Sequence, residues 1–149
     1  MVVEKLPPDT YHELIDIWER SVRATHHFLP EDYIVQLKPL ILENYFYAVD
    51  LFGVRDVEGR IQGFLGLSAD KIEMLFIDSG IRGKGIGKAL MHFAVFEKHI
   101  RKVDVNEQNE HAVAFYKKLG FAVTNRLTTD SLGKPYPILE MELVNDLWK

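Results

Sequence analysis

Apolar residues recur every three or four positions in several segments of the chain, which is the spacing of one buried helix face. Two such segments lie in the first third of the chain. Pro39 falls inside the second of them, where its missing N–H and its ring predict an irregular or divided helix. The apolar face of the first helix consists of Leu14, Ile17, Trp18 and Val22, and that of the second consists of Tyr33, Ile34, Leu37, Leu40 and Ile41. Two further helices are predicted over Gly85–His99 and Asn109–Leu119.

Shorter runs of β-branched and aromatic residues, bounded by turn residues, predict strands between and after these helices. The turn at residues 56–59 joins two runs into a hairpin, and the loop at residues 130–137 joins the last two. The predicted strands are Val2–Leu6, Tyr45–Val54, Arg60–Leu67, Lys71–Asp78, Lys102–Asn106, Phe121–Thr128 and Ile138–Val144.

The predicted element order is β-α-α-β-β-β-α-β-α-β-β, in which hairpins and strand–helix–strand units both occur. Hairpins give antiparallel neighbours, whereas a strand–helix–strand unit gives a parallel pair. The order therefore predicts an α/β fold with a mixed sheet. A chain of 149 residues without repeats, low-complexity tracts or linkers suits one core, so we expect a single domain over residues 1–149.

Composition and charge exclude several classes of function. Lys and Arg number 18 against 22 Asp and Glu, and the net charge of −4 disfavours a general nucleic-acid-binding protein. The chain has no cysteine, and the adjacent His26 and His27 lack a third ligand at helical spacing, so we expect no metal site. No apolar run approaches the roughly 18 residues of a membrane span, and MVVEKLPPD is no signal peptide. We therefore expect a cytoplasmic protein that binds neither membrane nor nucleic acid.

The stretch RGKGIGKAL places alternating glycines among cations where a predicted strand meets a predicted helix. These glycines can serve a tight turn alone. Alternatively, they let the backbone approach an anion, which the unpaired N–H groups of a helix start and Arg82, Lys84 and Lys88 would stabilise. The sequence does not fit either of two common nucleotide-binding motifs, the phosphate loop and the dinucleotide-binding motif. Ala89 stands where a phosphate loop needs a hydroxyl, and the glycine spacing does not fit G-x-G-x-x-G.

Two motifs together resemble those of the GNAT superfamily of acyl-CoA-dependent N-acetyltransferases. Residues 82–87, RGKGIG, fit its pyrophosphate-binding signature R/Q-x-x-G-x-G/A. Residues 109–121, NEHAVAFYKKLGF, match its second signature, N-x-x-A-x-x-F-Y-x-x-x-G-F. The element order agrees along almost the whole chain, and DVNEQNEHAVAFYKKLGF with the later LGKPYP is similar to a small bacterial subgroup of single-domain members. Ser79 and Ile81 depart from the proline and the aromatic residue that many members have there.

The resemblance implies a mostly antiparallel sheet of six to seven strands, with helices on both faces and a central parallel pair that splays apart. It also implies acetyl-CoA as the donor, with the amides of pantetheine added to the free strand edge. Asn109 would contact pantetheine, although it is equally expected as a helix N-cap. The residues that the resemblance assigns to CoA are Leu75, Phe76, Ile77, Arg82, Gly83, Lys84, Gly85, Ile86, Gly87, Lys88, Asn109 and Tyr116.

The reaction that the resemblance implies is direct attack of an amine on the thioester carbon, with the N–H of Ile77 stabilising the acetyl oxygen. Tyr116 stands where the family's tyrosine reaches the thioester sulfur. A phenol of pKa ~10 is a weaker acid than a thiol of pKa ~8.5, so full proton transfer is uphill by about 2 kcal/mol, and a hydrogen bond is the alternative. Two carboxylates are candidates for the base that takes the proton of the amine. Glu73 should lie on the same face of its strand as Leu75, because side chains two residues apart share a face, and Asp104 lies on the neighbouring strand.

The segment ATHHFLPEDY joins the first two helices, where the family builds its acceptor site, and supplies His26, His27 and Phe28 as acceptor-binding candidates. The two histidines could orient the substrate or relay a proton, or they could be ordinary loop residues. Tyr136 in the late loop is a fourth candidate, because loops carry specificity. The sequence thus predicts an acetyl-CoA-dependent N-acetyltransferase acting on a primary amine of a small molecule, peptide or protein. A non-catalytic acyl-CoA-binding sensor is the alternative, and we expect a monomer or a homodimer.

Overall fold

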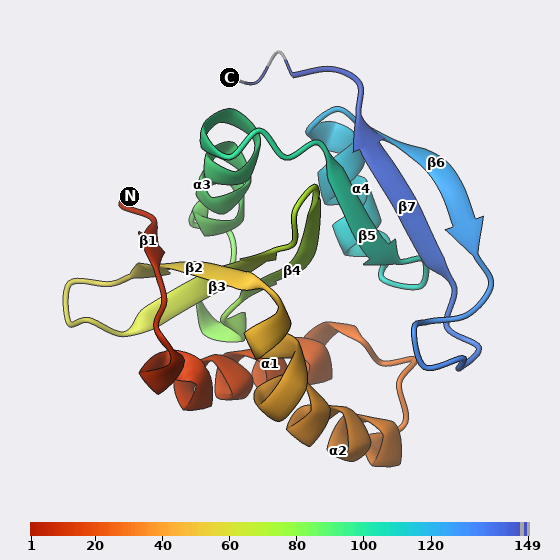
Figure 1. The fold of residues 1–149 in the computed structure, drawn as a ribbon, viewed down its shortest axis with the longest axis horizontal. Helices are drawn as coiled ribbons and strands as arrows, with labels where there is room; N and C mark the ends of the chain where they lie inside the picture. Colours follow the sequence, from red (N-terminus) through yellow and green to blue (C-terminus); the bar gives the residue numbers. More distant parts are fainter. Residues whose placement is uncertain (147, 149) are drawn as a thin grey trace.

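A computed structural model describes residues 1–146 and 148 and contains one seven-stranded sheet with helices on both faces (Figure 1). The strands lie in the order β1-β2-β3-β4-β5-β7-β6, and β4 and β5 form the parallel pair. The predicted α/β class and mixed sheet are confirmed. The elements are β1 Glu4–Lys5, α1 Tyr11–Thr25, α2 Glu31–Leu40, β2 Asp50–Arg55, β3 Ile61–Leu67, β4 Lys71–Ile77, α3 Ile86–His92, β5 Lys102–Asn106, α4 Glu110–Lys118, β6 Phe121–Leu127 and β7 Ile138–Leu143.

One predicted strand is half helical. The sequence predicts a strand over Tyr45–Val54, but α2 continues through a π-helical turn at Ile41–Tyr45 and a 3-10 turn at Phe46–Ala48 before β2 begins. Phe46 is fully buried in this turn, and its ring meets that of Phe64 edge-on at a centroid distance of 5.8 Å. These aromatic residues therefore serve the core from a helical turn, and packing overrides their preference for strands.

Each face of the sheet has its own apolar core. α1 and α2 pack on one face, in a cluster that includes Leu14, Trp18 and Phe64. α3 and α4 pack on the other face, in a cluster that includes Leu90 and Met141. Figure 1 shows the first two helices below the sheet and the other two towards the top. A ligand that reaches both faces must therefore pass where two strands part.

β4 and β5 begin as a parallel pair and then separate. Their ladder holds over two residue pairs, Lys71–Lys102 and Ile72–Val103. A β-bulge interrupts β4 at Glu73, which bends the strand at this point. β5 instead pairs with β7 over all five of its residues. The second half of β4 is thus left without a neighbouring strand on that side, and the predicted splay is confirmed.

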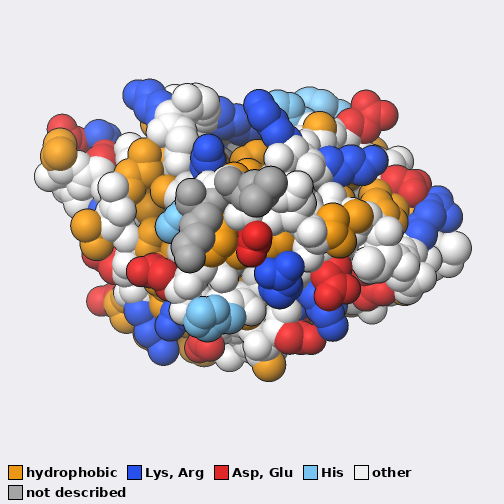
Figure 2. Space-filling view, turned by 90° about the horizontal axis from the view of Figure 1, so that it is seen from above, with side chains coloured by type: hydrophobic (Ala, Val, Ile, Leu, Met, Phe, Trp, Pro, Cys, Tyr) orange, Lys and Arg blue, Asp and Glu red, His pale blue; other side chains and the backbone are white. Residues whose placement is uncertain are grey.

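The face of the molecule in Figure 2 carries charged side chains of both signs interspersed with apolar ones, in keeping with the net charge of −4. Among the described residues, no helix combines the length and the apolar character needed to cross a bilayer. In the same residues, no group of three or more His, Asp or Glu side chains is arranged to hold a metal ion.

Candidate active site

The free edge of β4 is formed by the backbone of Leu75 and Ile77. In the antiparallel pair of β3 and β4, Asp78 donates its N–H to the carbonyl of Gln62 at 2.9 Å. Facing residues of such a pair alternate between hydrogen-bonded and non-bonded positions. Leu75 and Ile77 fall on the non-bonded positions, so their N–H and C=O groups point away from β3 and into the gap left by β5. An extended molecule in this gap can bond the edge as an added strand would.

The turn between β4 and α3 requires glycine for its backbone conformation. Gly83 and Gly85 have φ angles of +83° and +80°, which other residues adopt only with strain. A Cβ atom at either position would meet no other atom within 4 Å, so packing does not demand glycine there. Ala89 is the first residue to bond within α3, to Gly85 at 3.0 Å, and the N–H groups of residues 86–88 have no acceptor inside the helix. The positive φ angles confirm the tight turn. Anion binding at this turn stays a prediction, and the bare backbone leaves space for it.

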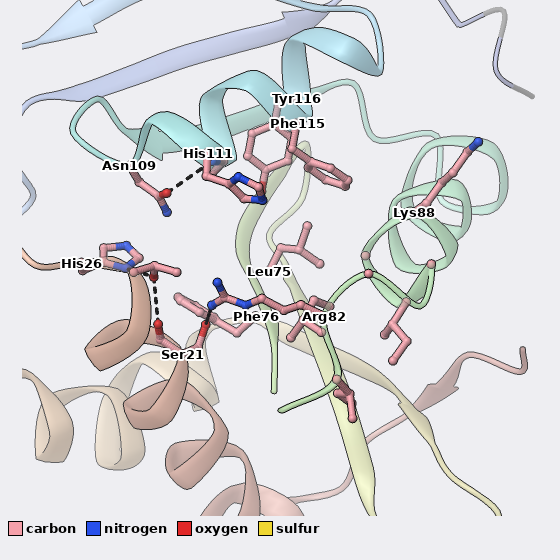
Figure 3. Close-up of a pocket in the computed structure, with 18 residues that line it drawn as sticks. Ser21, His26, Leu75, Phe76, Arg82, Lys88, Asn109, His111, Phe115 and Tyr116 are labelled. Carbon is pink, nitrogen blue, oxygen red and sulfur yellow. Dashed lines mark hydrogen bonds between the residues drawn. The ribbon is translucent and has the colours of Figure 1, made fainter. Parts of the chain in front are cut away.

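The free edge of β4, the glycine turn and the start of α4 enclose a cavity of about 330 Å³ (Figure 3). Ser21, Thr25 and His26 close it from the end of α1. Every residue predicted to bind CoA lines this cavity except Lys84. The other lining residues are Leu75, Phe76, Ile77, Ile81, Arg82, Gly83, Gly85, Ile86, Gly87, Lys88, Asn109, His111, Ala112, Phe115 and Tyr116.

Tyr116 is buried and projects from α4 towards the cavity (Figure 3). The rings of Phe115 and Phe121 pack edge-on against it, and its hydroxyl has no hydrogen-bond partner within the described part of the chain. Burial raises the pKa of its phenol above the ordinary value. The hydroxyl therefore stays protonated and can donate a hydrogen bond, while full proton transfer to a thiolate costs more than the sequence alone indicates.

Asn109 is the N-cap of α4, and its expected contact with pantetheine stays a prediction. Its Oδ1 accepts a hydrogen bond from the N–H of Ala112 at 3.2 Å, which caps the start of α4. The same side chain lines the cavity, where Figure 3 shows it opposite Ser21. Its amide nitrogen has no partner among the described residues, so Asn109 can cap the helix and donate to a ligand at once.

His26 ends α1 and is 7% exposed. The hydroxyl of Thr25 donates to the carbonyl of Ser21 at 2.8 Å and lies 2.7 Å from Nδ1 of His26. Burial, and then the charges of Arg82 and His27, lower the pKa of His26 to about 4. Its imidazole is therefore neutral at neutral pH.

Arg82 connects the glycine turn to α1. Its guanidinium donates to the hydroxyl of Ser21 at 3.4 Å, and its side chain lines both the cavity and an adjoining open hollow. Arg20 of α1 makes two hydrogen bonds of 3.0 Å to the carboxylate of Asp78, which fastens the end of β4 to the same helix. Lys88 adds a second cation to the cavity lining from α3.

The two carboxylates predicted as bases lie outside the cavity lining. Glu73 is exposed at the bulge of β4 and accepts a hydrogen bond from the hydroxyl of Ser68 at 3.0 Å. Asp104 of β5 is paired with Lys71 at 3.0 Å. The bulge breaks the two-residue alternation that related Glu73 to Leu75. A base role for either carboxylate stays a prediction.

The four predicted acceptor-binding residues separate into two groups. His26, Phe28 and Tyr136 form an aromatic row, with ring centroids 5.2 Å apart for His26 and Phe28 and 6.1 Å apart for Phe28 and Tyr136. His27 lies instead in the lining of the open hollow, with His111. Of the four, His26 lines the cavity itself.

The aromatic row is anchored by Tyr33 of α2. Its ring stacks on that of Tyr136 at a centroid distance of 5.3 Å, and its hydroxyl donates a hydrogen bond to the carboxylate of Asp130. Asp130 also accepts the backbone N–H groups of Leu132 and Lys134, at 3.0 Å and 2.9 Å. These contacts hold the loop between β6 and β7 against α2.

Four polar or aromatic lining residues lie outside the predicted site: Ser21, Thr25, His111 and Phe115. Ser21 and Thr25 are four residues apart on α1, and His111 and Phe115 are four apart on α4, so each pair shares a helix face. Phe115 and His111 lie within the second signature, so the sequence already indicated that this part of α4 faces a ligand. The apolar residues of α1 predict only which helix face packs on the core, and they give no reason to place Ser21 and Thr25 at a cavity.

Known proteins resemble this chain in sequence and in fold. A profile of the family described as "Acetyltransferase (GNAT) domain" matches residues 36–134. Peptidyl-lysine N-acetyltransferase YjaB of Escherichia coli K12 is 42% identical over 132 residues, which is 89% of each chain. The solution structure of apo YjaB from E. coli matches with a TM-score of 0.86 and 39% identity, over 97% of this chain and 99% of that one. The fold is also that of PaiA N-acetyltransferase from Thermoplasma acidophilum in complex with coenzyme A (TM-score 0.72, 22% identity, 95% and 99% coverage).

Acid unfolding tests the burial of His26. Its folded pKa of about 4 lies below the ordinary value, so the unfolded chain binds a proton more readily and acid favours unfolding. The stability from keeping it neutral is complete above about pH 6.5 and is lost as the pH falls towards 4, by roughly 3 kcal/mol in total. In urea titrations at about pH 7 and pH 4.5, we expect the wild type to lose about 2 kcal/mol more than His26→Gln. Equal losses in both proteins would show that His26 is not held neutral by burial.

Proposed function

The chain belongs to the GNAT family of acetyl-CoA-dependent N-acetyltransferases, and we propose that its acceptor is the ε-amine of lysine in a peptide or protein. One observation carries this acceptor class, namely the 42% identity with a peptidyl-lysine N-acetyltransferase over nearly the whole of both chains. The apolar wall that Phe76, Ile81 and Phe115 give to the cavity suits the aliphatic stem of lysine.

The residues around the cavity fit the acetyl-CoA donor. The bare backbone at Gly83 and Gly85 leaves space for a phosphate, and the free N–H groups of residues 86–88 with Arg82 and Lys88 would hold its charge. The free edge at Leu75 would pair with the amides of pantetheine. Acetyl-CoA supplies the acetyl group as an activated thioester.

Ile77 and Tyr116 would act on the reacting atoms. The N–H of Ile77 points into the gap and would donate to the acetyl oxygen, which gains negative charge as the amine attacks. Tyr116 would donate a hydrogen bond to sulfur as the C–S bond breaks. Because burial raises the pKa of Tyr116, its part is hydrogen-bond donation rather than full proton transfer.

Donor binding is tested by Gly85→Glu. Glutamate at this position is strained by the positive φ and places a negative charge beside the proposed pyrophosphate site. Calorimetry should show acetyl-CoA affinity reduced by at least about 30-fold, the equivalent of roughly 2 kcal/mol. Gly59→Glu is the matched control, since Gly59 has φ +84° in the turn between β2 and β3, away from the cavity, and should leave the affinity at the wild-type value. Equal affinities in both variants would exclude the glycine turn from the donor site.

Turnover is tested by Tyr116→Phe, which removes the hydroxyl and keeps the ring. We expect kcat for acetylation of a lysine-containing peptide to fall by about 10²-fold, because the leaving sulfur loses a hydrogen bond that matters most when its charge develops. Acetyl-CoA affinity should stay within about threefold, less than 1 kcal/mol. Mass spectrometry of the peptide and release of the CoA thiol are the measurements.

The same assay separates the alternatives. A non-catalytic sensor would bind acetyl-CoA with no acetyl transfer by the wild type to any amine. Transfer to small polyamines or amino acids, with none to peptides or proteins, would contradict the lysine acceptor while keeping the transferase activity.

A further inference from the structure

The contacts of the Thr25 hydroxyl at the end of α1 indicate the tautomer of His26. This hydroxyl lies 2.8 Å from the carbonyl of Ser21, which can only accept a hydrogen bond, and 2.7 Å from Nδ1 of His26. The hydroxyl has one proton, so with that proton directed to the carbonyl it accepts a hydrogen bond from Nδ1–H. On this ground we assign the ring proton to Nδ1, which leaves a lone pair on Nε2 of the neutral ring.

His26 lines the same cavity as the free edge of β4. Nε2 has no hydrogen-bond partner among the described residues, and the ring lines the cavity (Figure 3). The figure places His26 on the α1 side and Tyr116 on the α4 side. Glu73 and Asp104 lie outside the lining, and His111 lines it from an exposed position on α4. His26 thus offers a buried, oriented and unused proton acceptor beside the free edge of β4.

We propose that Nε2 of His26 accepts the proton of the attacking amine, and that Thr25 is the positioning residue that fixes its tautomer. This inference rests on the proposed function. The lone pair of a neutral lysine amine forms the N–C bond, the C–S bond breaks, and its electron pair stays on sulfur as a thiolate. The proton that nitrogen sheds passes to Nε2, and the imidazolium later returns it to water. Tyr116 stabilises the thiolate with its hydrogen bond.

A weakly basic imidazole suits this step. A free lysine ammonium would give its proton to a base of pKa about 4 only at a large cost, so the acceptor must arrive neutral. The positive charge of Arg82 in the same cavity favours the neutral amine. Once the N–C bond forms, the attacking lysine nitrogen is positively charged and bonded to the former thioester carbon. Because that carbon also carries the electron-withdrawing oxygen, the nitrogen is then a much stronger acid than a free ammonium. His26 is basic enough to take the proton at that stage.

Ionisable side chains from several elements line the cavity or the adjoining hollow around His26. They are Arg82 from the glycine turn, His27 from the loop after α1, Lys88 from α3, and His111 and Tyr116 from α4. Arg82 lowers the pKa of His26 through its positive charge. Pairing of Arg82 with the pyrophosphate of the donor would offset that charge. We therefore expect the pKa of His26 to be higher with acetyl-CoA bound than in the free protein.

The first test is the rate of acetyl transfer to a lysine peptide by His26→Asn. Asparagine keeps a donor towards Thr25 in place of Nδ1–H but puts no proton acceptor at the position of Nε2. We expect kcat to fall by about 10²-fold or more, with acetyl-CoA affinity within about threefold of the wild type. The decline of kcat towards acid pH should disappear in the variant. His12→Asn, an exposed histidine on the same helix, is the matched control and should keep the wild-type rate.

Variants of Thr25 give a second test, which still decides the role of His26 if the His26→Asn protein fails to fold. Thr25→Val removes the hydroxyl at nearly constant volume and should lower kcat about tenfold, whereas Thr25→Ser should recover most of the lost rate. Nitrogen NMR of the histidine ring reports the tautomer directly. We expect Nδ1–H in the wild type and in Thr25→Ser, and a mixture of tautomers in Thr25→Val.

Three results would overturn the proposal: a wild-type kcat in His26→Asn, an Nε2–H tautomer in the wild type, or a kcat loss found only in Glu73→Gln, Asp104→Asn or His111→Asn. A wild type that acetylates no peptide defeats the lysine acceptor instead. In that case the tautomer, and the rate of the same variants on whichever amine is acetylated, still decide the role of His26.

Discussion

The backbone of β4 beyond the bulge at Glu73 is the constraint on which the site depends. Groups taken out of water need hydrogen-bond partners, and β3 satisfies only alternate residues of this stretch. β5 pairs with β4 over only two residues, whereas all five of its residues pair with β7. The polar groups of Leu75 and Ile77 therefore stay open in the middle of the sheet. A ligand that carries amides would complete the sheet there, so we propose that the donor binds in the place of a missing strand.

The surroundings of the gap give the two side chains that we propose to react, His26 and Tyr116, their properties. Because the gap passes through the sheet, α1 closes it from one face with Thr25 and His26, and α4 closes it from the other with Tyr116. Tyr116 is buried in the apolar core on the side of α3 and α4, and His26 is 7% exposed at the end of α1. The same desolvation lowers the pKa of His26 and raises that of Tyr116, so both side chains are neutral at neutral pH. In the proposed reaction His26 accepts the proton of the amine and Tyr116 donates a hydrogen bond to sulfur.

The sequence predicted the donor side of the site better than the acceptor side. The glycine turn and NEHAVAFYKKLGF each join a backbone requirement to a fixed spacing, and all of their residues that were assigned to CoA, except Lys84, line one cavity. Lys84 is the exception, because a cation in the motif can point away from the backbone that binds. Glu73 could not be placed, since a bulge adds a residue to one strand and KIEMLFI contains no mark of it. The position of Thr25 depends on how α1 packs over the gap, which no local pattern encodes.

Amide hydrogen exchange at Leu75, Phe76 and Ile77, with and without saturating acetyl-CoA, tests the missing strand most directly. The N–H of Phe76 points towards β3 and should exchange slowly in both states. Those of Leu75 and Ile77 should exchange fast in the free protein and slow by at least about tenfold when acetyl-CoA binds. Slow exchange at both positions in the free protein, or no change with acetyl-CoA bound, would contradict a free edge that the donor completes.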